Sequence, residues 1–211
     1  MNRLEIDGYS DFVCPWCFIG SRRLEAALQS IGETQILMRH RPYLLYPNVP
    51  SDGIELRASL SERYGQDPER LFEPVEAAGR QSGIPLDFSK VKRVYSTVDA
   101  HTLVRHAHAK GTQSGLAEEI FAAYFVEGQN IADRNVLVHI AVRHGFTLAE
   151  THAILDDPAE RLRTRDEADR VAKSGIRGVP LYVINGRETV SGAQSPSVFT
   201  RAIKGTLPSL A

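Results

Sequence analysis

The feature that most constrains this chain is its one pair of cysteines, which stand three positions apart as Cys14-Pro15-Trp16-Cys17. Residues 4–9 alternate apolar and polar side chains, as a strand does, and a helical spacing of apolar residues begins at Cys14. A cysteine at a helix N-terminus lies beside unpaired backbone N–H groups and the positive end of the helix dipole. That environment favours the thiolate, the form that attacks disulfides, so the motif predicts redox chemistry.

A metal site and a structural disulfide are the alternatives for this pair. A closed zinc site needs four ligands, and no third cysteine exists in the chain. The histidines closest to a ligand pair, His101 and His106, stand far downstream within an expected helix. A structural disulfide between Cys14 and Cys17 would close a very small loop and restrict the unfolded chain little. We therefore expect both cysteines to be catalytic, with no metal and no tightly bound cofactor.

The composition of the chain limits the classes of partner that it can bind. A chain of 211 residues with 42% hydrophobic and 24% charged residues is long enough, and apolar enough, to bury a sizeable core. Its net charge of −1 offers no basic surplus for nucleic acid, and no apolar run is long enough to predict a membrane helix. Residues 1–7 lack the apolar core of a secretory signal. We therefore expect a cytoplasmic protein, in which a C-x-x-C pair is mostly reduced and used transiently.

Hydrophobic periodicity predicts a mixed α/β chain with a helical middle. Strands are expected over 4–9 and 36–43, and the helix between them, which Gly32 ends, makes the two strands a parallel β-α-β unit. Near the C-terminus, Asn185-Gly186 predicts a tight hairpin. Further helices are expected over 54–64, 68–82, 96–110, 115–127, 133–144, 147–155, 166–174 and 195–205, and the hairpin strands over 181–184 and 187–190.

Local capping signals support several of these helices. The spacing of a capping box, a hydroxyl residue followed three positions later by glutamate, occurs at Ser59/Glu62, Thr147/Glu150 and Thr164/Glu167. Asp133 is a good N-cap residue for the helix that ends before Gly145.

Four segments together resemble the FrnE subgroup of DsbA-like proteins, which have a thioredoxin fold. The segments are Asp11-Phe12-Val13-Cys14-Pro15-Trp16-Cys17-Phe18-Ile19-Gly20, Asp99-Ala100-His101, Gly178-Val179-Pro180 and Val190-Ser191-Gly192-Ala193-Gln194. The resemblance covers essentially the whole chain. It implies a thioredoxin fold with a large all-helical insertion between its two halves: residues 1–47 and 164–211 as the thioredoxin-like domain, and residues 48–163 as the insertion.

The resemblance also implies roles at the site. Cys14 attacks a substrate disulfide and Cys17 resolves the mixed disulfide, while Pro15 and Trp16 shape the turn and tune the potential. Pro180 is expected to be cis and to face the sulfurs, and the Val179 backbone to dock an extended peptide. Without the resemblance, Pro180 is only a proline at the start of a strand. The expected partners are protein or peptide thiols and disulfides, with glutathione as a candidate small thiol.

Two other functions remain open. A glutathione-dependent transferase or isomerase would resemble the kappa-class and 2-hydroxychromene-2-carboxylate isomerase relatives of this fold, which typically have serine where this chain has Cys14. A binding module on a redox-dead scaffold is disfavoured by the intact C-x-x-C pair. The direction of electron flow, the natural substrate and the oligomeric state, a dimer included, do not follow from the sequence.

Other polar residues have weaker functional interpretations. Asp11, three residues before Cys14, is either a proton-transfer group or a turn-forming or solvated aspartate. The remaining candidates have structural interpretations: His101, His106 and His108 as surface or satisfied core histidines, and Arg39, His40 and Arg41 as the charged edge of a strand.

Overall fold

The computed structural model describes residues 3–32 and 35–207. Its strands are β1 (Arg3–Ser10), β2 (Gln35–Pro42), β3 (Ile54–Glu55), β4 (Arg93–Val94), β5 (Leu181–Ile184) and β6 (Glu188–Ser191). Its helices are α1 (Pro15–Ile31), α2 (Leu56–Tyr64), α3 (Glu69–Gln81), α4 (Val98–Lys110), α5 (Gln113–Phe125), α6 (Arg134–Arg143), α7 (Leu148–Asp156), α8 (Pro158–Lys173) and α9 (Pro196–Thr206).

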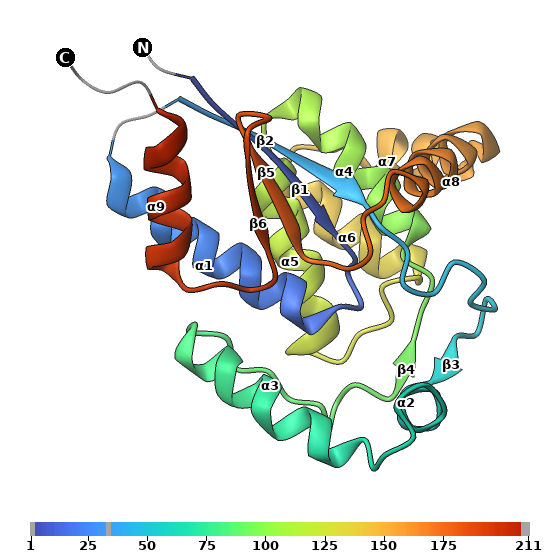
Figure 1. Ribbon diagram of the computed structural model, residues 1–211. Coiled ribbons are helices and arrows are strands. Elements are labelled where there is room, and N and C mark those ends of the chain that lie inside the picture. Colours follow the sequence, from blue (N-terminus) through green and yellow to red (C-terminus); the bar gives the residue numbers. More distant parts are fainter. Residues whose placement is uncertain (1–2, 33–34, 208–211) are drawn as a thin grey trace.

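The main sheet is mixed and has the strand order β2-β1-β5-β6. β1 pairs with β2 in parallel, and β5 pairs antiparallel with both β1 and β6. The first β-α-β unit and the last hairpin therefore meet in one sheet, although more than half of the chain lies between them (Figure 1). A small mixed sheet built from both ends of the chain is what the resemblance implied.

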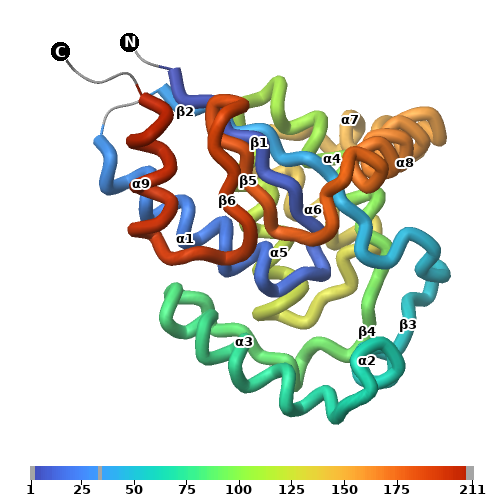
Figure 2. The backbone as a smooth tube through the Cα atoms, viewed as in Figure 1, coloured from blue at the N-terminus to red at the C-terminus, as the bar shows by residue number. Residues whose placement is uncertain are grey.

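One face of this sheet is apolar and is covered by two helices. The even-numbered residues of β1, among them Leu4 and Ile6, are buried on this face. They share a core cluster with Leu24 of α1, Tyr182 of β5 and Phe199 of α9. Helices α1 and α9 consequently lie side by side against the sheet (Figure 2). This packing fixes α1, and with it the cysteine pair at its N-terminal end.

A larger core joins α1 to the helical part of the chain. The ring of Phe121 in α5 stacks on Phe18 of α1 at a centroid distance of 5.2 Å and lies 4.9 Å from Phe12. Phe125 also stacks on Phe18, at 6.2 Å. Both cysteines belong to the same buried cluster. The cysteine pair thus lies where the sheet and the helical segment meet.

Residues 54–94 form an arm below the N-terminal end of α1 (Figure 1). The arm contains α2 and α3, and its ends are joined because Ile54 of β3 pairs with Val94 of β4. Helix α3 contacts α1, and Phe72 of α3 stacks on Phe88 at 4.3 Å. The two-residue strands are absent from the sequence prediction because such short strands have no periodicity to detect.

The local signals of the sequence are confirmed at three positions. Asp133 is the N-cap of α6 and accepts the Asn135 N–H at 2.8 Å. Thr147 and Glu150 form a complete capping box at the start of α7. Asn185 and Gly186 have φ angles of 49° and 63°, the left-handed values of a type I′ turn. Asn185 also accepts the Glu5 N–H at 2.8 Å and donates to Thr206 at 3.0 Å, which ties the hairpin to β1 and α9.

The last helix before the hairpin starts earlier than predicted. The expected start is residue 166, but α8 begins at Pro158, with Asp157 as N-cap accepting the Ala159 N–H at 2.8 Å. Thr164 is therefore an interior residue, and its hydroxyl bonds to Thr102 of α4 at 2.8 Å. Ser59 likewise lies inside α2, whose N-cap is Glu55. Both predicted capping boxes are wrong. The division at residues 163 and 164 stays a prediction, and it falls within α8.

Among the described residues, no helix is both long enough and apolar enough to cross a membrane.

Candidate active site

The cysteine pair occupies the first turn of α1. Cys14 is the N-cap residue, with extended backbone angles, and Pro15 takes the first helical position, where no N–H is needed. The Cys14 N–H donates to the Asp11 carbonyl at 3.0 Å, and the Cys17 N–H donates to the Cys14 carbonyl at 3.0 Å. Both residues are free thiols. Trp16, between them, is 39% exposed. The predicted position of the C-x-x-C pair at a helix N-terminus is confirmed.

The two thiols differ in their surroundings. Burial raises the pKa of the Cys17 thiol well above its usual range, and its hydrogen bond with Cys14 raises this pKa further. The protonated form of Cys17 is therefore favoured before any reaction. Cys14, in contrast, lines a pocket that opens on the surface. Cys14 therefore lies at the pocket, and Cys17 does not line it.

The segment before β5 lies against Cys14. The Val179–Pro180 peptide bond is cis, as the resemblance implied. The Cys14 thiol donates to the Val179 carbonyl oxygen at 3.8 Å, and Pro180 is buried. A Cβ atom at Gly20 would lie 3.1 Å from Pro180 Cγ and 2.8 Å from Tyr182 Oη, so the glycine allows α1 to approach this segment closely. The fold thus brings together all six residues predicted for the site: Cys14, Pro15, Trp16, Cys17, Val179 and Pro180.

A buried acid and a buried imidazole lie behind the cysteine turn. Asp11 accepts the Leu45 N–H at 2.7 Å through Oδ2, and its Oδ1 lies 3.6 Å from Nε2 of His101. Asp11 is 1% exposed and His101 4%, so the expectation of a solvated aspartate is wrong, while its carbonyl does form the cysteine turn. Among the described residues, neither Asp11 Oδ1 nor His101 Nε2 has a hydrogen-bond partner. Sequence reasoning missed this pair, because His101 approaches Asp11 only through the packing of α4 on the segment after β1, where its ring lies 4.5 Å from Phe12.

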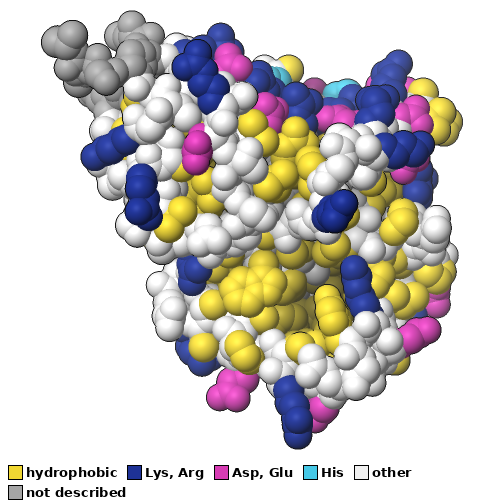
Figure 3. Space-filling model, viewed as in Figure 1, with side chains coloured by type: hydrophobic (Ala, Val, Ile, Leu, Met, Phe, Trp, Pro, Cys, Tyr) yellow, Lys and Arg dark blue, Asp and Glu magenta, His cyan; other side chains and the backbone are white. Residues whose placement is uncertain are grey.

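A cavity of about 340 Å³ opens beside Cys14, between the cysteine turn and the arm. In the space-filling view, hydrophobic side chains gather over this part of the molecule, above α2 and α3 (Figure 3). The charged residues of its lining are two arginines, Arg63 at the end of α2 and Arg70 at the start of α3. The rest of the lining is Val13, Cys14, Pro15, Trp16, Leu45, Tyr46, Leu56, Leu60, Tyr64, Leu71, Phe72, Pro74, Val75, Phe88, Val94, Tyr124 and Phe125.

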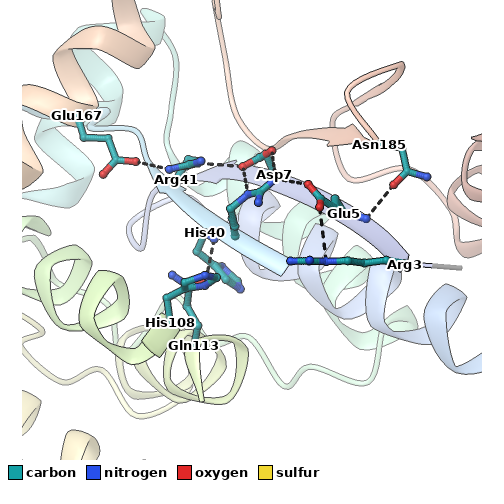
Figure 4. A network of polar contacts seen from close by, with 10 residues as sticks. Arg3, Glu5, Asp7, His40, Arg41, His108, Gln113, Glu167 and Asn185 are labelled. Atoms are coloured by element: carbon teal, nitrogen blue, oxygen red, sulfur yellow. Dashed lines mark hydrogen bonds and ion pairs between the residues drawn. The ribbon is translucent and has the colours of Figure 1, made fainter. Parts of the chain in front are cut away.

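Arg39 and Arg41 of β2 lie away from this cavity, in a polar network on the face of the sheet opposite α1 (Figure 4). Arg39 and Arg41 donate to Asp7 of β1 at 3.0 and 2.9 Å, and Arg41 also donates to Glu167 of α8 at 3.0 Å. His40 bonds to Ser114 of α5 at 3.2 Å. The predicted charged edge is confirmed for Arg39 and Arg41, whereas His40 lies on the other face of β2, against α5. None of the three residues lines the pocket at Cys14.

His106 and His108 also have partners among nearby side chains. His106 bonds to Glu160 of α8 at 2.8 Å, and His108 lies 3.4 Å from the amide oxygen of Gln113. In the part of the chain that the structure describes, no three His, Cys, Asp or Glu side chains are grouped as metal ligands.

A mixed sheet with a C-x-x-C pair at the first helix and a cis-proline against it defines the thioredoxin class of fold. The chain belongs to the DSBA-like thioredoxin domain family, which matches residues 5–204. The expected α/β thioredoxin fold with a helical insertion is thereby confirmed.

Three solved structures are similar over nearly the full length. A probable DsbA oxidoreductase, SCO1869 of Streptomyces coelicolor, is 28% identical with a TM-score of 0.85, covering 99% of this chain and 93% of the other. A 2-hydroxychromene-2-carboxylate isomerase is 16% identical with a TM-score of 0.73, covering 95% of each chain. The cytosolic disulfide reductase DsbM of Pseudomonas aeruginosa, solved with GSH, is 18% identical with a TM-score of 0.67, covering 95% and 98%. The last two show the shared fold.

Proposed function

We propose that this protein is a thiol–disulfide oxidoreductase of the FrnE subgroup that acts through Cys14 and Cys17 on protein or small-thiol substrates. The observation that carries the proposal is the placement of Cys14 at the N-terminus of α1, within hydrogen-bonding distance of the Val179 carbonyl. The first turn of α1 leaves its backbone N–H groups unpaired beside this sulfur. Membership of the DSBA-like family supports the same chemistry.

The reaction uses the two sulfurs in sequence. The Cys14 thiolate attacks one sulfur of a substrate disulfide, so that a mixed disulfide forms and one substrate thiolate leaves and takes up a proton. Cys17 then loses its proton and attacks Cys14, which releases the second substrate thiol and leaves a Cys14–Cys17 disulfide. A thiol reductant returns the pair to the dithiol form. The same steps in reverse oxidise a substrate dithiol, and the redox poise of the compartment sets the direction.

Two kinds of partner fit the surroundings of Cys14. The backbone of Val179 offers a strand-like docking edge to an extended peptide, with Pro180 and Trp16 beside the sulfur. Glutathione is the proposed small thiol, since the DsbM structure was solved with it. That disulfide reductase is cytosolic, and we propose the cytoplasm for this protein as well.

A glutathione-dependent transferase or isomerase is the second candidate. The cavity beside Cys14 favours it, because it has the size of a small-molecule site. The pair of cysteines favours the oxidoreductase, since a transferase or isomerase needs no resolving thiol.

Single cysteine variants test the proposal. We expect Cys17→Ser to accumulate a mixed disulfide with glutathione or a peptide disulfide, because the resolving thiol is gone. Cys14→Ser should lose exchange activity, because the remaining thiol is buried and protonated. Mass spectrometry of the intact protein detects the adduct, and reduction of insulin measures the exchange. Activity retained by Cys14→Ser, or the absence of any adduct on Cys17→Ser, would contradict the assignment.

A further inference from the structure

The two arginines at the cavity beside Cys14 have no carboxylate partner among the described residues. Arg57, nearby on α2, is paired with Glu69 at 2.7 Å, whereas no ion pair within those residues forms at Arg63 or Arg70. The guanidinium of Arg63 instead lies over the rings of Tyr46 and Tyr64, at 5.5 and 5.8 Å. No aspartate or glutamate of the described chain lines the cavity. The opening therefore carries positive charge that these residues do not neutralise there.

The interior of the cavity is mostly apolar. Phe72 and Val75 of α3 and Phe125 of α5 form part of its wall and are buried. The hydroxyl of Tyr124, a further wall residue, already donates to the Arg93 carbonyl at 2.9 Å. A ligand with peptide groups would lose hydrogen bonds to water here without regaining them, which is costly. The apolar interior therefore suits a ligand part that has no peptide groups.

We infer that the cavity binds the organic group of a small carboxylate-bearing disulfide, an inference that rests on the function proposed above. An aromatic or branched aliphatic body fills the apolar interior, and its carboxylate lies at Arg63 and Arg70. Its sulfur reaches Cys14, which lines the same cavity. Cys14 attacks that sulfur, the disulfide bond breaks, and the other half leaves as a thiol. Cys17 then releases the bound half as a second thiol, and an added dithiol such as dithiothreitol reduces the protein again.

Three disulfides separate the contributions of charge and apolar body. The first is bis(4-carboxybenzyl) disulfide. The second is its bis-amide, which lacks the negative charge but keeps the same surroundings at the sulfur. The third is 3,3′-dithiodipropionate, which keeps the carboxylate but has no ring. The measured quantity is the second-order rate constant for oxidation of the pre-reduced protein, followed by thiol release. We expect the carboxybenzyl compound to react fastest, by about tenfold over dithiodipropionate, since a buried ring contributes on this scale.

Arginine variants test the anion contact. Arg63→Gln and Arg70→Gln should each slow the carboxybenzyl compound about three- to fivefold more than they slow its amide, as expected for exposed ion pairs. Arg201→Gln, at an exposed arginine of α9, is the matched control and should change neither rate. Circular dichroism shows whether each variant is folded.

The outcomes distinguish this inference from the proposed function. Equal rates for the acid and the amide, or a preference that survives both arginine variants, would overturn the inference while the exchange chemistry stands. A reduced protein that reacts with none of the three compounds and with no peptide disulfide would overturn both.

Discussion

At the residue scale, the site depends on the hydrogen bonds that Asp11 accepts near the sulfurs. Asp11 has two roles that the sequence does not separate: its carbonyl accepts the Cys14 N–H, and its carboxylate accepts the Leu45 N–H. Leu45 also lines the cavity. A single buried aspartate therefore connects the cysteine turn to the wall of the proposed substrate site.

Replacement of Asp11 should lower the free energy of unfolding. The loss should depend on whether the new side chain still offers an acceptor to the Leu45 N–H. Asp11→Ala leaves the Leu45 N–H unpaired in a buried setting, so we expect a loss of about 1–3 kcal/mol in the free energy of unfolding. Asp11→Asn keeps an oxygen acceptor and places a donor near His101 Nε2, 3.6 Å from the present oxygen, so it should cost clearly less. Urea unfolding of both variants measures the difference. Equal losses in the two would show that the hydrogen bond to Leu45 is not what matters.

At the element scale, the sequence predicts what is local and misses what is brought together by packing. β1 and α1 follow from periodicity, because each has a buried apolar face, and the hairpin of β5 and β6 follows from the Asn185-Gly186 turn signal. The early start of α8 is signalled by Asp157-Pro158, a good N-cap followed by proline, but Thr164 offers a competing signal. β3 and β4, the His101 contact and the cavity wall depend on tertiary contacts that no local pattern encodes.

Thr147 and Ser59 both have the spacing of a capping box in the sequence, but their replacement should affect stability differently. Thr147→Ala removes the N-cap of α7, whose hydroxyl accepts the Glu150 N–H at 3.1 Å, and should cost about 1 kcal/mol in the free energy of unfolding. Ser59→Ala, at a capping-box spacing that lies inside α2, should cost little, because no cap is lost. Thermal and urea unfolding compare them. A larger loss for Ser59→Ala would contradict the assignment of Glu55 as the N-cap of α2.

At the scale of the whole molecule, the polar network between β2 and the helices makes stability depend on pH. Burial, with smaller contributions from the nearby His101 and His108, lowers the pKa of His40 to about 4. In the unfolded chain this pKa is about 6.5, so between these values the unfolded state binds a proton that the folded state does not. His40 therefore contributes to a loss of stability as the pH falls through this window.

Removal of the imidazole should reduce this acid sensitivity. We expect the free energy of unfolding of the wild-type protein to fall between pH 7 and pH 5, and to fall less in His40→Gln, which cannot take up the proton. His152→Gln, at an exposed histidine of α7, serves as the control and should behave like the wild type. Urea titrations at the two pH values give the comparison. The same pH dependence in His40→Gln and wild type would show that other groups account for it.

The arm of residues 54–94 has a consequence for how such proteins diversify. The sulfurs lie on α1, which the sheet and α9 fix, whereas both arginines of the cavity lie on the arm. Because β3 and β4 bring the ends of the arm together, it forms a nearly closed excursion of the chain. Buried residues of the arm, such as Phe72 and Val75, share a core with both cysteines, whereas its two cavity arginines are exposed. The proposed reactivity and the proposed selectivity thus lie on separate stretches of sequence, and the exposed arginines can change in evolution while the cysteine pair is kept.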